Sequence, residues 1–228
     1  MIRIAIDGPS GAGKSTVAKR IAHDLSIIYV DTGAMYRCIG LYILRQGKNT
    51  KSAEEVVPCL ADISIKTTYD PQNGQRIFLN GEDVSEAIRT PEGSMAASDV
   101  SAIPQVRSFL LELQQDMARH QSLIMDGRDI GTVVMPEAEL KIFLTASSES
   151  RAHRRYLEYV QKNIPANYDD ILQDVLKRDH QDSTRAAAPL RQAEDAVLLD
   201  TTEINFENTV AIIKDMIQKK LQELSLTI

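Results

Sequence analysis

The chain has 228 residues, of which 43% are hydrophobic and 25% are charged, an ordinary composition for one large globular domain. Its net charge of −6 argues against bulk nucleic-acid binding, which usually requires a basic face. No signal peptide is expected, because a strand pattern begins at once, and no apolar run reaches transmembrane length, so we expect a cytoplasmic protein without a membrane partner.

A glycine-rich loop follows the first predicted strand, residues 2–7. The segment GPSGAGKST fills positions 8–16, and Gly8, Gly13, Lys14 and Ser15 match the phosphate-loop pattern G-x-x-x-x-G-K-[ST]. Glycines let successive backbone N–H groups point into one hollow, and the positive end of the next helix also attracts phosphate. We therefore expect binding of a nucleoside triphosphate, with Lys14 on the β- and γ-phosphates and the Ser15 hydroxyl on Mg²⁺.

Four further apolar runs predict buried parallel strands, because helical patterns separate most of them. These runs are residues 27–30, 123–125, 140–144 and 196–199. Three of the runs are followed by an aspartate, namely Asp31, Asp126 and Asp200. Since ligands bind at the carboxyl ends of such strands, we expect Asp31 and Asp126 to face the crevice of the phosphate loop. Asp200 is equally typical of a helix-capping turn.

Two segments interrupt this alternation. Residues 62–89 contain two alternating stretches around the turn residues 71–74, and Asn80-Gly81 offers a second turn, which predicts an antiparallel β insertion. Residues 148–185 are rich in arginine and predict two charged helices with a break at 163–167. Such a helical hairpin is suited to a mobile lid.

Arginines mark where a second phosphorylated substrate could meet the γ-phosphate. Arg37 follows the second strand, Arg128 lies two residues beyond Asp126, and others gather in the lid segment: Arg151, Arg154, Arg155, Arg178 and Arg185. Guanidinium groups make bidentate contacts to phosphate, although any single lid arginine is equally typical of a solvated helix face. A phosphate acceptor is already anionic near neutral pH and needs no general base. The pattern therefore favours transfer of a phosphoryl group to another phosphate group, as on a nucleoside monophosphate, and not to an alcohol.

Longer strings identify a family. IAIDGPSGAGKST, YVDTGAMYR, MDGRDIGTVVMPEAELKIFLTAS, RAHRR and KRDHQDSTRAAAPL together resemble bacterial cytidylate kinases, over residues 2 to about 220. The resemblance implies transfer of the γ-phosphate of ATP to CMP or dCMP with Mg²⁺, giving ADP and CDP or dCDP in pyrimidine nucleotide metabolism. It implies an α/β P-loop kinase fold with a central five-stranded parallel sheet, flanking helices, an antiparallel β insertion in the monophosphate-binding lobe and a short helical lid.

The resemblance also divides the single domain, residues 1–228. The core is expected at 1–31, 120–150 and 186–228, the monophosphate-binding lobe at about 32–119 with its insertion at about 62–90, and the lid at about 151–185. The two cysteines, Cys38 and Cys59, have no zinc-site spacing and are expected to be packing residues. We expect a monomer whose partners are ATP and CMP or dCMP.

Site residues are carried over one at a time from the matching motifs. ATP binding is expected at Gly8, Pro9, Ser10, Gly11, Ala12, Gly13, Lys14, Ser15 and Thr16. Substrate binding is expected at Thr32, Tyr36, Arg37, Ser98, Arg107, Arg128, Asp129, Arg178, Asp182 and Arg185. Lys14, Arg128 and Arg185 are the expected catalytic residues, and Ser15 the expected Mg²⁺ ligand. Thr32 stands where many relatives carry serine, which keeps the hydroxyl and adds a methyl group.

Within this pattern, Ser98, Arg107 and Asp129 match the residues that read the base. Chemistry supports Asp129 independently, because cytosine presents an amino donor to a carboxylate, whereas uracil presents a carbonyl there. A site that leaves a buried polar group unpaired discriminates strongly. Outside the family pattern, Asp129 is equally typical of a helix N-cap or of a salt-bridge partner for Arg128.

Two other functions fit the phosphate loop. The first is a kinase for UMP, AMP or a small alcohol, which a panel of acceptors would distinguish. The second is a non-catalytic nucleotide-binding switch, which would show a damaged loop or lack the acceptor-side arginines. Both the loop and those arginines are present.

Overall fold

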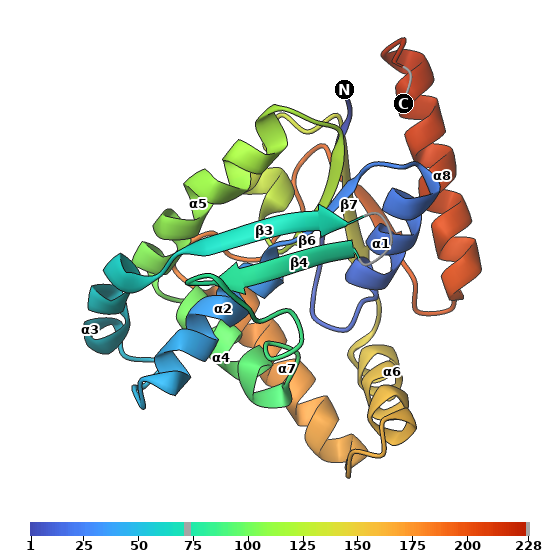
Figure 1. Cartoon of the computed structure of the whole chain (residues 1–228). Helices are drawn as coiled ribbons and strands as arrows, with labels where there is room; N and C mark the ends of the chain where they lie inside the picture. Colours follow the sequence, from blue (N-terminus) through green and yellow to red (C-terminus); the bar gives the residue numbers. More distant parts are fainter. Residues whose placement is uncertain (71–73, 227–228) are drawn as a thin grey trace.

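The computed structural model in Figure 1 describes residues 1–70 and 74–226. Its centre is a five-stranded parallel sheet with the order β2-β6-β1-β7-β8. The strands are β1 (Arg3–Asp7), β2 (Ile28–Asp31), β6 (Leu123–Gly127), β7 (Leu140–Thr145) and β8 (Val197–Asp200). They coincide with the five apolar runs of the sequence, so the predicted parallel sheet is confirmed.

Helices cover both faces of this sheet, which explains why its strands are continuous apolar runs. On β1, Ile4 and Ile6 pack into the core on one face and Ala5 into the core on the other, as the period-two alternation of a strand requires. The first core lies under α1 (Lys14–Asp24) and α8 (Phe206–Glu223). The second lies under α2 (Thr32–Arg45), α4 (Pro91–Ser101) and α5 (Pro104–Arg119).

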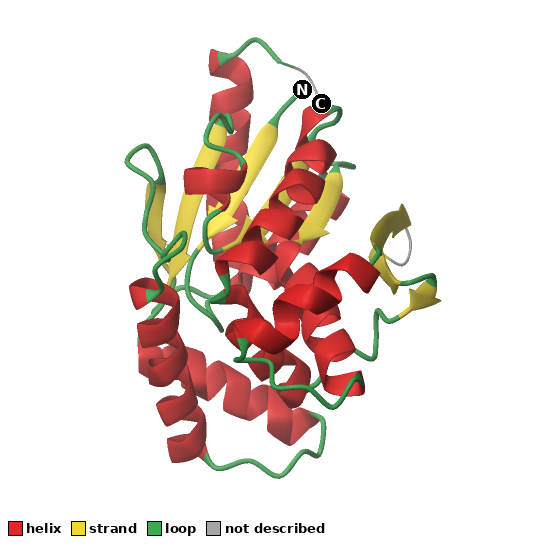
Figure 2. Cartoon of the chain, turned by 90° about the vertical axis from the view of Figure 1, so that its left-hand side faces the viewer, coloured by secondary structure: helices red, strands yellow, loops and turns green. Residues whose placement is uncertain are grey.

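The predicted β insertion is confirmed as a separate antiparallel sheet, which stands apart from the central sheet in Figure 2. Its strands are β3 (Ile65–Asp70), β4 (Gly74–Leu79) and β5 (Glu82–Asp83), preceded by the short helices α3 (Ala53–Val56) and η1 (Val57–Asp62). Asn80 and Gly81 both have positive φ, 50° and 87°, as a tight hairpin turn demands. The other predicted turn, at 71–74, includes residues 71–73, which lie outside the described residues.

The arginine-rich segment forms the predicted helical hairpin, α6 (Ser148–Gln161) and α7 (Tyr168–Thr184). Asn167 caps α7 by accepting from the N–H groups of Asp169 and Asp170, so the break falls where the sequence places it. Figure 1 shows the hairpin at the end of the molecule opposite the two termini. Among the described residues, no helix combines the length and apolar character needed to cross a bilayer.

Candidate functional site

A cavity of about 550 Å³ lies at the carboxyl ends of the parallel strands, within the usual size of a small-molecule site. Its wall comes from the phosphate loop, α2, α4, α7 and the segment after β6. All the residues expected to bind the monophosphate line it: Thr32, Tyr36, Arg37, Ser98, Arg107, Arg128, Asp129, Arg178, Asp182 and Arg185. From the loop, the lining residues are Ser10, Gly11, Gly13, Lys14, Ser15 and Thr16.

The phosphate loop depends on two of its glycines. Gly8 has a φ of +148°, and a Cβ there would lie 1.9 Å from the carbonyl oxygen of Leu144. Gly13 has a φ of +90° and precedes α1, whose first turn has no side-chain cap. The first N–H groups of this helix therefore have no capping side chain as acceptor and can donate to an anion.

Lys14 is folded onto its own loop. Its Nζ donates to the carbonyl oxygen of Pro9 at 2.8 Å, and the side chain is buried. Burial and the nearby positive charge of Arg128 lower the pKa of Lys14 to about 7. A bound polyphosphate would supply the negative charge that favours the protonated amine.

Asp126, at the end of β6, accepts hydrogen bonds from two hydroxyl groups, and the sequence pattern did not reveal these contacts. One of its carboxylate oxygens accepts from the Ser15 hydroxyl at 2.8 Å and the other from the Tyr29 hydroxyl at 2.7 Å. Burial and the neighbouring Asp31 raise the pKa of Asp126. Its only sequence signal was its position at a strand end, and the predicted orientation of Asp31 and Asp126 toward the cavity is confirmed.

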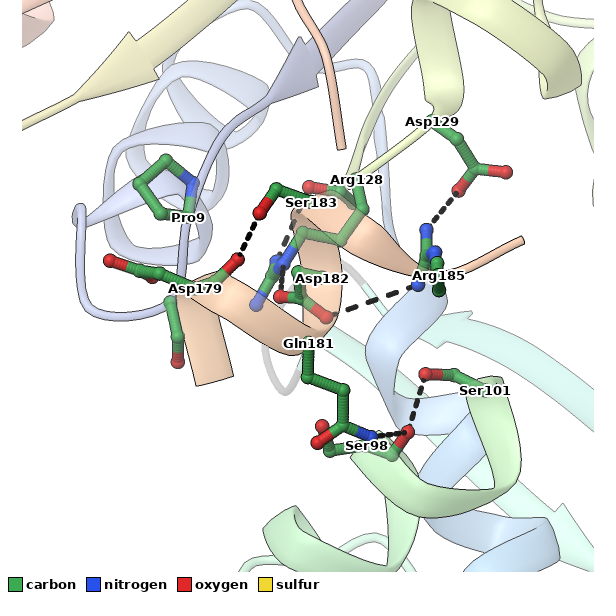
Figure 3. A network of polar contacts seen from close by, with 12 residues as sticks. Pro9, Ser98, Ser101, Arg128, Asp129, Asp179, Gln181, Asp182, Ser183 and Arg185 are labelled. Carbon is green, nitrogen blue, oxygen red and sulfur yellow. Dashed lines mark hydrogen bonds and ion pairs between the residues drawn. The ribbon is translucent and has the colours of Figure 1, made fainter. Parts of the chain in front are cut away.

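Carboxylates neutralise several of the arginines that line the cavity. Arg37 pairs with Asp31 at 3.3 Å, and Arg128 pairs with Asp182 at 2.7 Å. Figure 3 shows this second pair together with Arg185, which reaches both Asp182 and Asp129. The pairs of Arg128 and Arg185 join the segment after β6 to the end of α7, whereas the pair of Arg37 lies within α2 and its N-cap residue.

Asp129 forms a buried pair with Arg107, so the two expected base readers meet directly. Arg107 also donates to the carbonyl oxygen of Ser101 at 3.3 Å and lies over the ring of Tyr36, 5.5 Å from its centroid. The two alternative interpretations of Asp129 are wrong. Its side chain caps no helix, and the carboxylate that pairs with Arg128 belongs to Asp182.

Two polar atoms at the cavity are buried without a hydrogen-bond partner among the described residues: Ser98 Oγ and Arg178 Nε. Buried polar groups are nearly always paired in folded proteins, so such atoms in a cavity wall are available to a ligand. Burial and the charge of Arg128 lower the pKa of Arg178 to about 10. Both residues were expected at the substrate site.

The arginines of α6 have separate environments. Arg151 is buried, holds Asp179 at 2.5 Å and donates to the carbonyl oxygen of Ser10 at 3.0 Å, so it ties the hairpin to the phosphate loop and is not on a solvated face. Arg154 donates to the carbonyl oxygen of Thr201 at 2.6 Å, and Arg155 to the hydroxyl of Tyr159 at 3.1 Å. Both of these arginines line the cavity.

Two further aspartates stand at strand ends. Asp7 accepts from the N–H groups of Ile130 and Gly131 at 2.8 and 2.7 Å and thereby fixes the turn that follows Arg128 and Asp129. Burial raises the pKa of Asp7 to about 6. Asp200 accepts from the backbone and hydroxyl of Thr202 and so forms a turn. The predicted helix-capping role is wrong, because Asn205 caps the next helix, α8.

Known proteins resemble this chain over nearly its whole length. A family model described as cytidylate kinase matches residues 4–219. A cytidylate kinase of Caldicellulosiruptor bescii is 49% identical over 220 residues, 96% of each chain. One of Carboxydothermus hydrogenoformans is 48% identical over 219 residues, covering 96% of this chain and 98% of the relative. An uncharacterised protein of Eubacterium ventriosum of solved structure shares the fold, with 11% identity, a TM-score of 0.53 and coverage of 96% and 99%.

Proposed function

This chain belongs to the cytidylate kinase family, and on that premise we propose that it moves the γ-phosphate of ATP to CMP or dCMP. The observation that carries the proposal is the buried Arg107–Asp129 pair in a cavity whose wall also contains the Ser98 hydroxyl, which has no hydrogen-bond partner among the described residues. A carboxylate accepts from the amino group of cytosine, while a guanidinium and a hydroxyl donate to its ring nitrogen and carbonyl. This set of donors and acceptors is complementary to cytosine. With uracil in the site, the Asp129 carboxylate would face a carbonyl oxygen, so two acceptors would lie opposite each other.

The donor side begins with the phosphate loop. Its backbone N–H groups and Lys14 would hold the β- and γ-phosphates of ATP, and Lys14 would exchange the Pro9 carbonyl for a phosphate oxygen. Ser15 and Asp126 supply the hydroxyl and carboxylate oxygens that suit Mg²⁺, and they already lie 2.8 Å apart. When bound with ATP, Mg²⁺ neutralises charge that develops on the transferred phosphoryl group.

The acceptor side is formed by arginines. Arg37 and Arg128 would bind the CMP phosphate, and Arg185 would clamp the phosphoryl group in transfer, each loosening its carboxylate partner as it does so. The ribose would lie near Arg178 and Asp182. Because the CMP phosphate is already ionised near neutral pH, the site needs no general base. Lys14, Arg128 and Arg185 act by neutralising and orienting charge.

The same premise extends to the chain's surroundings. We propose a cytoplasmic monomer that works on free nucleotides, with no nucleic-acid or membrane partner. One chain supplies every residue named above, so the cavity needs no second copy. Sedimentation of the purified protein tests this state: a stable dimer under assay conditions would contradict it.

A coupled assay of the purified chain tests the function. ATP is supplied with CMP, dCMP, UMP or AMP in turn, and formation of ADP is followed. CMP and dCMP should be the best acceptors by a wide margin. Equal turnover of UMP or AMP would point to a kinase of other specificity, and nucleotide binding without turnover of any acceptor would point to a switch protein.

A further inference from the structure

The carboxyl end of α4 is held by a residue from the α6–α7 hairpin. The last carbonyl groups of a helix lack intrahelical partners, and here the N–H of Ala102, which follows α4, bonds to Asp99 instead of Ser98. The Ser98 carbonyl oxygen accepts from the side-chain amide of Gln181 at 3.1 Å and from the Ser101 hydroxyl at 2.9 Å. Figure 3 shows the Gln181 side chain reaching from α7 to this oxygen.

The two oxygens of Ser98 therefore face different partners. The backbone oxygen is bound by Gln181, whereas the hydroxyl oxygen is buried without a partner among the described residues, in the wall of the cavity. The same helix end also reaches Arg107, which donates to the Ser101 carbonyl oxygen. Ser98 and Arg107 thus depend on one short stretch of backbone.

Gln181 is also next to Asp182, the partner of Arg128. Gln181 therefore contacts a residue of the expected base site, and Asp182, its neighbour on α7, contacts a residue of the expected phosphate site. Among the hydrogen bonds formed by the described residues, the one from Gln181 to Ser98 is the one that joins α7 to α4.

We propose that Gln181 is a positioning residue for the acceptor base. By binding the Ser98 carbonyl it fixes the end of α4, so that the Ser98 hydroxyl and Arg107 are aligned with cytosine when α7 is docked. Gln181 thereby couples recognition of the base to the position of the hairpin. This inference rests on the proposed function and adds a residue that the family motifs did not assign.

Gln181→Leu removes the donor and keeps the size of the side chain. One lost hydrogen bond of about 0.5–1.5 kcal/mol should raise the KM for CMP roughly two- to tenfold, with kcat and the KM for ATP within twofold of the parent. Gln181→Lys keeps a donor and should restore most of the affinity. His180→Leu, at the exposed neighbouring position, is the matched control and should leave both KM values unchanged.

A double-mutant cycle shows whether Gln181 acts through Ser98. In a Ser98→Ala background, Gln181→Leu should raise the KM for CMP by clearly less than it does in the parent, because the hydroxyl is gone and only the alignment of Arg107 is left to be lost. The positioning role would be overturned if Gln181→Leu changed the KM for CMP by the same factor in both backgrounds. Equal increases in the KM for CMP and in the KM for ATP would also overturn it. Melting temperatures of all variants identify loss of folding. If the parent protein neither binds nor phosphorylates CMP, the proposed function fails with it, whereas CMP turnover with an additive cycle overturns the coupling alone.

Discussion

Four arginines on the acceptor side are held near aspartates before any substrate arrives. Arg37, Arg107 and Arg128 each have a carboxylate partner, and Arg185 lies between Asp129 and Asp182, 3.8 and 3.9 Å away. Without such partners, like charges gathered in a buried cavity would repel one another at high cost. The carboxylates thus allow the protein to keep guanidinium groups where phosphates will bind.

At Asp129 this arrangement makes a prediction about specificity. Asp129→Asn replaces an acceptor-only carboxylate with an amide that can also donate. Loss of a charge-assisted hydrogen bond of about 1.5–3 kcal/mol should lower kcat/KM for CMP by roughly one to two orders of magnitude. Turnover of UMP should fall less or rise, because the amide can donate to the uracil carbonyl. The quantity to measure is the CMP-to-UMP ratio, since partial unfolding would lower both; an unchanged ratio would show that Asp129 does not read the base.

At Lys14 the prediction concerns protons. With a pKa of about 7 in the free protein, Lys14 is mostly neutral at pH 8, and phosphates raise that pKa when they bind. ATP binding at pH 8 should therefore take up close to one proton, and affinity should fall as the pH rises above about 7. Asp7, with a pKa of about 6, is already ionised at pH 8 and adds little there. Calorimetry in two buffers of different ionisation enthalpy measures the uptake.

Lys14→Ala is the control for that measurement. It should abolish proton uptake at pH 8 and lower turnover by about 10²–10³, the effect of removing one electrostatic contact from a transition state, while the protein stays folded. Uptake that persists in Lys14→Ala would assign the proton to another group. Half of the parent activity in this variant would contradict the role of the loop.

At the scale of elements, the α6–α7 hairpin has little apolar packing of its own. Its core consists of Ala152, Ile171 and Val175, with partly buried side chains around them. Polar contacts therefore matter more for its attachment than they do for α1 or α8. Arg151 is the central one, because it joins α6 to α7 through Asp179 and joins both to the phosphate loop through Ser10.

Arg151→Ala should consequently destabilise the protein. Breaking a buried ion pair costs about 3–5 kcal/mol, and because the Asp179 side chain is 27% exposed, water recovers part of this. We expect a loss of about 2–3 kcal/mol in the free energy of unfolding, measured with denaturant. Lys162→Ala breaks an exposed pair with Glu158 on the same hairpin and should cost less than about 1 kcal/mol. Similar losses in both variants would contradict the structural role of Arg151.

At the scale of the whole molecule, the cavity is assembled from parts that meet only through tertiary contacts. The phosphate loop belongs to the sheet, Ser98 to α4, and Arg178, Asp182 and Arg185 to α7 and the residue that follows it. Ligands that bridge these parts should hold them together. Closure of the hairpin would exclude water that could otherwise accept the γ-phosphate.

Hydrogen exchange tests this closure. Addition of CMP with a non-hydrolysable ATP analogue should slow exchange, with the added protection concentrated in residues 148–185. CMP alone should protect this region less, because it occupies only the acceptor side. Equal exchange of the hairpin with and without both ligands would contradict a closing lid.

The sequence predicted the elements better than their contacts. The five strands could be found because a parallel sheet buried on both faces leaves short apolar runs, and the loop could be found because phosphate binding needs glycines at defined spacing. The pairs Arg107–Asp129 and Arg128–Asp182 could not be found from the sequence, because their members are 22 and 54 residues apart. Neither helical nor strand periodicity connects residues at such separations. The same reason concealed the contact of Ser15 with Asp126, 111 residues away.

The strand order has a consequence for synthesis on the ribosome. β1 lies in the middle of the sheet, and its neighbours are β6 and β7, whose residues begin to pair with it at Leu123 and Leu140. At about 5–20 residues per second, β1 waits roughly 7–30 seconds until both partner strands have been translated. The phosphate loop, although it is translated well before these strands, can therefore acquire its working shape only late in translation. Nascent chains that stop before residue 145 would carry the motif without an ATP site.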